Sequence, residues 1–111
     1  MSTRKHSNSQ EKQVAKATGG HKVANSGATP FHKGDVITEH HVIECKTMMT
    51  EKKSMSIKKE WIEGIKEEAF AMGKPYWALA FNFGNSLRNE ENYYIISEQQ
   101  FNILTDKLEE E

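Results

Sequence analysis

Two carboxylates and a lysine near the middle of the chain have the types and the spacing of a metal-dependent hydrolytic site. They are Asp35, Glu44 and Lys46. Carboxylate oxygens are ligands that Mg²⁺ takes from proteins, while waters and substrate phosphates complete its shell. A bound cation polarises a phosphoryl oxygen and lowers the pKa of a bound water, and a nearby ammonium offsets negative charge in the transition state. These residue types indicate phosphodiester hydrolysis, although so short a pattern also occurs in exposed hairpins with solvated charges.

The segment that carries these residues predicts a β-hairpin. Two short runs with β-branched residues, 35–38 and 41–46, flank the polar dipeptide 39–40, which fits a two-residue turn. In such a hairpin the start of the first strand lies beside the end of the second. We therefore expect Asp35 to lie close to Glu44.

Side chains alternate between the two faces of a strand. In the run 41–46, Glu44 and Lys46 therefore point to one face, and Cys45 points to the other. Cys45 is the only cysteine in the 111 residues, so the chain forms no internal disulfide. Its position predicts a small buried hydrophobic residue rather than a nucleophile.

Residues 57–72 predict an amphipathic helix. Gly73 stands where a helix C-cap belongs, with Pro75 beyond it,. We expect Ser54 or Ser56 to cap the start of this helix. The predicted apolar stripe consists of Ile57, Trp61, Ile65, Ala69 and Met72, with Ile62 and Phe70 alongside,.

Two further strands and a final helix are predicted after this helix. The run 76–83 is almost continuously apolar, as in a strand buried on both faces,, and its position after a strand and a helix favours a parallel crossover. Residues 93–96 form another strand, and 97–100 fit a capping box. The final helix then presents Phe101, Leu104 and Leu108 on one side.

The predicted architecture is therefore an α/β domain with a central mixed β-sheet flanked by helices, in the order α-β-β-β-α-β-β-α. We expect this single domain to span residues 9–111, after a basic flexible tail at residues 1–8.

The chain also resembles a known family, the PD-(D/E)XK nuclease superfamily, and within it the small Holliday-junction resolvases of archaea and phages. The resemblance covers roughly residues 7–83, and Gly34 stands where the superfamily name has Pro. The segments that carry it are Gln10-Glu11-Lys12, Gly19-Gly20, Asn25-Ser26-Gly27-Ala28, Gly34-Asp35-Val36 and Ile43-Glu44-Cys45-Lys46, followed by the long amphipathic helix.

The resemblance implies a restriction-endonuclease-like core and a DNA endonuclease that uses one or two Mg²⁺ ions per site, with Mn²⁺ able to substitute. Its products would carry 5′-phosphate and 3′-hydroxyl ends. The implied catalytic residues are Glu11, Asp35, Glu44 and Lys46, with Ser26 near the scissile phosphate. The implied metal ligands are Glu11, Asp35, Glu44 and the backbone carbonyl of Cys45.

The role of Glu11 depends on which face of the first helix is buried. If that helix buries Val14, Ala15 and Ala17, then Glu11 lies one turn earlier and reaches the edge of the same face. The alternative is a first-turn carboxylate that the helix dipole favours.

Charge is divided unevenly along the chain. The net charge is −1, but residues 1–59 carry eleven Lys or Arg against five Asp or Glu, a net +6, while residues 60–111 carry four against eleven, a net −7. The basic half contains the candidate site, as expected for a surface that displaces counterions from phosphates. The candidate phosphate contacts are Lys33, Lys52, Lys53, Lys58 and Lys59, although any one of them could equally be a solvated charge.

The predicted substrate is branched DNA, above all the four-way junction. Two strands of a junction must be cut symmetrically and one chain has one site, so we expect a homodimer. Two alternatives remain open: another nuclease on the same scaffold that cuts linear or flapped DNA, and a DNA-binding module without catalysis. No apolar run approaches the ~20 residues that span a bilayer, and no signal peptide is evident. We expect a cytoplasmic protein of a bacterial or phage-infected cell.

Overall fold

The computed structural model describes residues 3–23, 34–48, 50–84 and 91–110, and its elements follow the predicted order. Ser26 and Lys33 lie outside the described residues. The elements are α1 (Thr3–Thr18), β1 (His21–Lys22), β2 (Val36–Ile37), β3 (His41–Lys46), α2 (Lys59–Ala71), β4 (Tyr76–Phe81), β5 (Tyr93–Ile95) and α3 (Glu98–Glu109).

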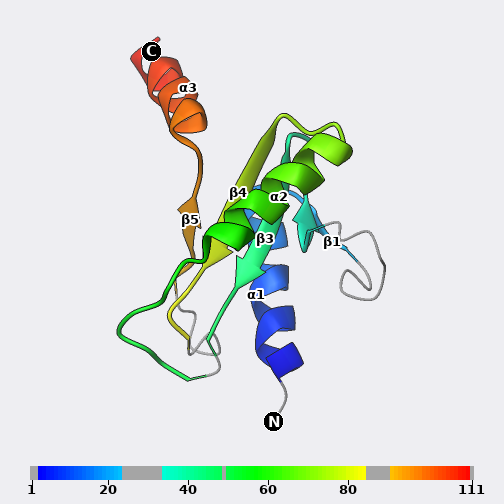
Figure 1. The fold of residues 1–111 in the computed structure, drawn as a ribbon, viewed down its shortest axis with the longest axis vertical. Helices are drawn as coiled ribbons and strands as arrows, with labels where there is room; N and C mark the ends of the chain where they lie inside the picture. Colours follow the sequence, from blue (N-terminus) through cyan, green and yellow to red (C-terminus); the bar gives the residue numbers. More distant parts are fainter. Residues whose placement is uncertain (1–2, 24–33, 49, 85–90, 111) are drawn as a thin grey trace.

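The five strands form one mixed sheet in the order β1-β2-β3-β4-β5. Only β3 and β4 pair in parallel, and the other three pairs are antiparallel. The parallel pair follows from α2, which returns the chain to the edge where β3 began. In Figure 1, α2 lies across one face of the sheet and α1 lies on the other. The predicted α/β class and mixed sheet are confirmed.

The predicted hairpin is confirmed in position and in register. Val36 of β2 lies opposite Ile43 of β3, and Ile37 lies opposite Val42. The turn is closed by the backbone N–H of Thr38, which donates to the carbonyl of His41 at 3.0 Å. Asp35, the residue before β2, lies beside the end of β3 that carries Glu44, because its N–H and its side chain are hydrogen-bonded to Ile43 and Cys45.

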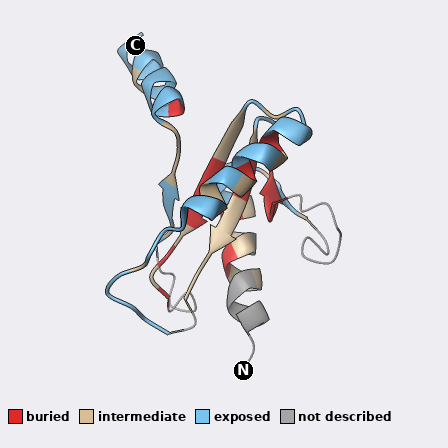
Figure 2. Ribbon diagram, in the orientation of Figure 1, coloured by how far each residue is buried: buried red, intermediate tan, exposed pale blue. Residues whose placement is uncertain are grey.

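The sheet buries apolar side chains on both of its faces. On the α1 side, Val14 packs with a cluster from the strands, and on the α2 side Ile65 and Ala69 do the same. Figure 2 shows the buried positions gathered where α2 meets the strands. The strand partners are Val36, Ile43, Ala78 and Ala80 on the first side and Ile37 and Val42 on the second.

Helix α2 is shorter than predicted. Its N-cap is Lys58, so the prediction that Ser54 or Ser56 caps the helix is wrong. The end was predicted correctly, since Gly73 follows the C-cap with a φ of 71°. Phe70 was expected beside the apolar stripe but is 87% exposed, because it follows Ala69 and lies about 100° around the helix from it.

The N-terminal end of the chain differs from the prediction, whereas the C-terminal helix agrees with it. The expected flexible tail at residues 1–8 is helical from Thr3 onward. At the other end, the hydroxyl of Ser97 caps α3 as predicted and accepts a hydrogen bond from Gln100 N at 3.1 Å. The apolar stripe of α3 is nevertheless uncovered, with Phe101 57%, Leu104 49% and Leu108 72% exposed, and α3 extends away from the sheet (Figure 1).

Helices of the described part of the chain lack the combination of length and apolar character that a membrane crossing requires.

Candidate active site

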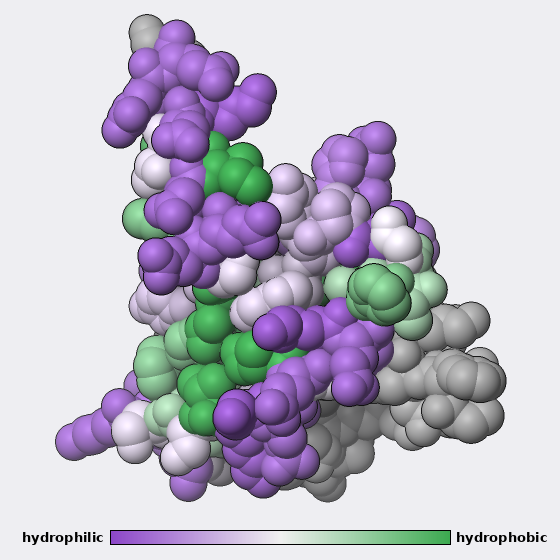
Figure 3. Space-filling view, turned by 45° about the horizontal axis from the view of Figure 1, so that its top comes forward, coloured by the Kyte–Doolittle hydropathy of each residue, from purple (hydrophilic) through white to green (hydrophobic). Residues whose placement is uncertain are grey.

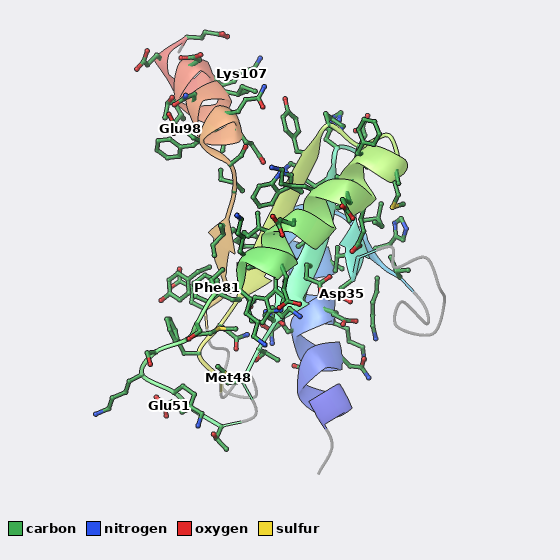
Figure 4. The ribbon with its side chains drawn as sticks, viewed as in Figure 1. Asp35, Met48, Glu51, Phe81, Glu98 and Lys107 are labelled. Atoms are coloured by element: carbon green, nitrogen blue, oxygen red, sulfur yellow. The ribbon has the colours of Figure 1, made fainter. Side chains whose placement is uncertain are left out.

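Asp35 is held by two hydrogen bonds to the backbone of β3. Its own N–H donates to the carbonyl of Ile43 at 2.9 Å, and its Oδ2 accepts from the N–H of Cys45 at 2.9 Å. The side chain is buried, at the end of the sheet shown in Figure 4. These two bonds tie the carboxylate to the strand that carries Glu44, as the hairpin predicted.

Gly34 sets the backbone conformation just before Asp35. Its φ is 75°, and a Cβ added there would lie 2.5 Å from Cγ1 of Val42. Proline has φ near −65°. A proline at this position could not adopt this conformation, and a larger side chain would meet Val42.

Glu44 and Lys46 lie on the same face of β3, as alternation predicted. Lys46 Nζ is 3.4 Å from Glu44 Oε2 and 4.5 Å from the ring centroid of Trp61. Trp61 is in the first turn of α2, so this helix limits where the ammonium can go. The carboxylate and the aromatic ring together hold the lysine beside the acidic residues.

Cys45 points to the opposite face and packs against the apolar cluster on the α1 side. Burial raises the pKa of its thiol, and the negative charge of Asp35 adds to the effect. A thiol with a raised pKa is a poor nucleophile at neutral pH. The interpretation of Cys45 as a packing residue is confirmed.

Helix α1 brings Glu11 to the same cluster of negative charge. Its side chain is 12% exposed, and its Oε1 lies 3.8 Å from Nζ of Lys22. Burial, followed by the negative charges of Asp35 and, more weakly, Glu44, raises the pKa of Glu11 to about 7, although Lys22 opposes the shift. The ionisation of Glu11 is therefore opposed by both Asp35 and Glu44.

The face of α1 that is buried was predicted only in part. Val14 is fully buried and Ala15 packs against the core cluster, but Ala17 is exposed. Glu11, one turn before Val14 and Ala15, lies at the edge of this face. This placement agrees with the first of the two interpretations, in which Glu11 reaches the edge of the buried face. The alternative, a first-turn carboxylate, does not fit, because α1 begins at Thr3 and has no acidic residue in its first turn.

Gln10, which sequence reasoning missed, fastens α1 to the ends of the two parallel strands. Its side chain is fully buried. Its Nε2 donates to the carbonyls of Lys46 at 2.9 Å and Ala80 at 3.3 Å, and to Oδ1 of Asn92 at 3.2 Å. The residue next to Glu11 is thus bonded to the backbone of the strand that carries Glu44 and Lys46.

Asn82 continues this polar network beyond β4 and is also fully buried. Its Nδ2 donates to Oδ1 of Asn92 at 3.0 Å, and its Oδ1 accepts from the hydroxyl of Thr47 and from the N–H of Gly84. The sequence held a signal here, because an asparagine inside the apolar run 76–83 requires partners when buried.

The described lysines of the predicted DNA surface lie on or near the segment between β3 and α2. Lys52 and Lys53 are exposed, and the N–H of Lys52 donates to the carbonyl of Phe83 at 2.8 Å. Lys58 is the N-cap of α2. Lys59 Nζ lies 3.9 Å from a carboxylate of Glu63, so it is the least available of the four for phosphate.

The chemistry of the donor set fits a hard divalent cation. Carboxylate oxygens suit Mg²⁺. Burial is the main cause of the raised pKa of Glu11, and a cation would relieve the smaller contribution that comes from the negative charges of Asp35 and Glu44,. Across the described ranges, no three side chains of the His, Cys, Asp and Glu types already converge as a metal-holding group. The acidic residues therefore approach one another without forming a closed cage.

Comparisons with protein families, with curated proteins and with solved structures found no match to this chain.

Proposed function

We propose that this chain is a metal-dependent DNA endonuclease with a restriction-endonuclease-like core, and that it resolves four-way DNA junctions. One observation carries the proposal. Asp35 accepts a hydrogen bond from the N–H of Cys45, the residue between Glu44 and Lys46, and Lys46 Nζ lies 3.4 Å from Glu44 Oε2. Helix α1 brings Glu11 close enough for its pKa to respond to both carboxylates. Carboxylates that repel one another reduce the stability of the fold, whereas together with a nearby ammonium they are useful for metal-dependent phosphodiester hydrolysis.

Glu11, Asp35 and Glu44 would hold Mg²⁺, with the carbonyl of Cys45 as a further oxygen ligand. When bound, the cation supplies Lewis-acid polarisation of the phosphate and lowers the pKa of a coordinated water. Asp35 contributes a carboxylate whose position is fixed by the N–H of Cys45. A ligand held in this way loses little side-chain entropy on binding the ion.

Lys46 would orient the attacking water and offset the charge that develops on the phosphate. Its ammonium is restrained by Glu44 at 3.4 Å and by the ring of Trp61 at 4.5 Å. Both contacts keep a flexible four-carbon side chain near one place. The exposed Lys52 and Lys53 would hold the DNA backbone farther from the reaction.

Resolution of a junction requires two active sites, so we further propose that the chain acts as a homodimer. The uncovered apolar stripe of α3 supports this, because a helix of 12 residues is marginal in water without packing,. A two-fold axis through that stripe would bury it and supply the second site.

The decisive experiment measures Mg²⁺-dependent cleavage of a synthetic four-way junction by Asp35→Asn and Glu44→Gln. Both variants should lose cleavage and keep DNA binding, because each removes a ligand carboxylate and one negative charge that faces phosphate. Glu39→Gln is a matched control, since Glu39 lies at the exposed tip of the same hairpin. Full cleavage by either site variant would contradict the assignment.

The products and the oligomeric state distinguish a resolvase from another nuclease on the same scaffold. A resolvase should be a dimer and should nick the junction at symmetric positions, leaving ligatable duplexes. Linear duplex of the same sequence should be cut far more slowly, because only the junction offers both scissile phosphates to the two sites at once. A monomer that prefers linear or flapped DNA would leave the nuclease proposal standing without the resolvase. DNA binding without Mg²⁺-dependent cleavage by the unsubstituted protein would favour the non-catalytic module.

A further inference from the structure

An aromatic group lies directly beside Lys46 and has no part in the proposed hydrolysis. In the strand register, Lys46 of β3 is opposite Phe81 of β4, and Phe81 is opposite Tyr93 of β5. Residues opposite one another on neighbouring strands point to the same face. The three side chains therefore form one row across the end of the sheet.

Phe83, just after β4, completes this group. We call Phe81, Phe83 and Tyr93 the aromatic row. Their ring centroids lie 5.6, 5.7 and 5.9 Å apart, and the rings meet edgewise or at a tilt, so they do not stack fully on one another. Phe81 and Phe83 are half-buried and Tyr93 is 44% exposed. A packed core would have buried these rings.

The aromatic row lies at the same end of the sheet as the acidic site. Figure 4 shows Phe81 and Asp35 on opposite sides of β3 at this end. Neighbouring strands are about 4.8 Å apart, so the positions of Phe81 and Tyr93 lie about one and two strand spacings from Lys46. Nucleotides next to a phosphate bound at Lys46 could reach both rings.

Positive charge is interleaved with these rings. The backbone of Lys52 is bonded to the carbonyl of Phe83 at 2.8 Å, which places this exposed lysine beside the row. Nζ of Lys58 lies 5.8 Å from the ring centroid of Trp61, on which Lys46 also rests. Glu51 and Glu91 are exposed nearby and reduce the local charge without removing the lysines. Figure 3 shows hydrophobic side chains gathered below α3 and bordered by hydrophilic ones.

We propose that the aromatic row stacks unpaired nucleobases of the DNA strand that is bound at Asp35, Glu44 and Lys46. The proposal rests on the proposed function for the position of that strand, and it narrows the substrate to DNA with unpaired or unstacked bases next to the cleaved phosphate. Flat rings bind bases of any identity, while lysines hold the phosphates between them. The selectivity would therefore be for DNA structure and not for sequence.

The test compares three variants in a Glu44→Gln background, which prevents cleavage. Tyr93→Leu keeps an apolar side chain but removes the ring, Tyr93→Phe keeps the ring, and Tyr94→Leu is the control. Tyr94 is similarly exposed, at 41%, but lies opposite Ala80 and so points to the other face of the sheet. The affinity for a short oligothymidine single strand is measured over a range of salt concentrations.

Tyr93→Leu should bind the single strand roughly tenfold more weakly, the order expected for loss of one base–ring stack. The slope of its affinity against salt should not change, because no charge is lost. Tyr93→Phe and Tyr94→Leu should bind like the parent. Equal binding by Tyr93→Leu, or an equal loss for duplex DNA of the same length, would overturn the proposal.

Photocrosslinking gives a second measurement that needs no substitution in the aromatic row. An oligonucleotide that contains 5-iodouracil crosslinks to aromatic side chains stacked on that base, so it should attach to Phe81, Phe83 or Tyr93. Attachment only at other residues would contradict the inference.

The two proposals can fail separately. Single-strand affinity that depends on Tyr93, without any DNA cleavage in Mg²⁺, would leave the aromatic row and remove the nuclease. Junction cleavage that does not depend on Tyr93 would support the nuclease and contradict the role of the aromatic row.

Discussion

Glu11 should make the folded protein less stable as the pH rises from 4.5 to about 7. Its pKa is 4.5 in an ordinary environment and about 7 in the fold, because burial and the negative charges of Asp35 and Glu44 disfavour its ionised form. The unfolded chain therefore releases this proton near pH 4.5 and the folded chain only near pH 7. The stabilisation is complete below the unfolded value and is lost as the pH rises to the folded one.

The size of this effect follows from the pKa difference. One pKa unit corresponds to about 1.4 kcal/mol of free energy, so the change from 4.5 to about 7 corresponds to about 3.5 kcal/mol at most. The side chain is only 12% exposed, which limits screening by solvent. Relaxation of α1 would reduce the measured effect, and we expect roughly 1–3 kcal/mol between the two ends of this pH range.

The assay is urea unfolding in the presence of a chelator, followed by the fluorescence of Trp61 and Trp77. The unsubstituted protein should lose stability between pH 4.5 and pH 7 relative to Glu11→Gln, which cannot ionise there. Glu67→Gln, at an exposed position on α2, should behave like the unsubstituted protein. Mg²⁺ should restore stability above pH 7 in the unsubstituted protein and less so in Glu11→Gln. Parallel pH curves for the unsubstituted protein and Glu11→Gln would refute the placement of Glu11.

Two further substitutions examine the DNA surface and the polar network. Replacing Lys52 and Lys53 together with Ala should weaken binding to every DNA shape. It should also reduce the slope of log affinity against log salt concentration by about 0.9 per lost phosphate contact on duplex DNA. Titrations at several salt concentrations measure this slope, and an unchanged slope would mean that the DNA binds elsewhere on the protein. Gln10→Ala should lower the free energy of unfolding in urea by about 1–3 kcal/mol, because buried carbonyls lose their donor. Lys12→Ala, at an exposed position on the same helix, should change it by less than about 0.5 kcal/mol, and equal effects of the two would count against the network.

The sequence predicted those features that depend on local periodicity. The turn at Glu39–His40 sets the hairpin register, and a strand that alternates can place Glu44 and Lys46 on only one common face. The apolar run that became β4 likewise indicated a strand buried on both faces, and Leu79 and Ala80 are both fully buried there. Strands joined by a short turn pair with each other, and this pairing depends little on the rest of the chain.

Features that depend on distant contacts were not predicted. Gln10 donates to Ala80, 70 residues away, and no local pattern indicates such a pairing. Helical spacing shows which positions share a face, but it does not show whether another element covers them. Phe101 and Leu108 of α3 have the spacing of a buried stripe and are nevertheless exposed. The start of α2 was also predicted wrongly, because several polar residues precede the helix and the local sequence does not show which of them is the N-cap.

The position of Gln10 next to Glu11 links stability to the proposed chemistry. Ionised Glu11 is repelled by Asp35 and Glu44, which favours movement of α1 away from β3. The hydrogen bonds of Gln10 to the carbonyls of Lys46 and Ala80 oppose that movement, since they join α1 to the ends of the strands next to the repelling groups. A buried amide can do this where an apolar side chain could not, because its bonds fix direction as well as distance. The hydrogen bonds of Gln10 therefore keep Glu11 near Asp35 and Glu44 in spite of their charge, which is the kind of positioning that the proposed metal site would need,.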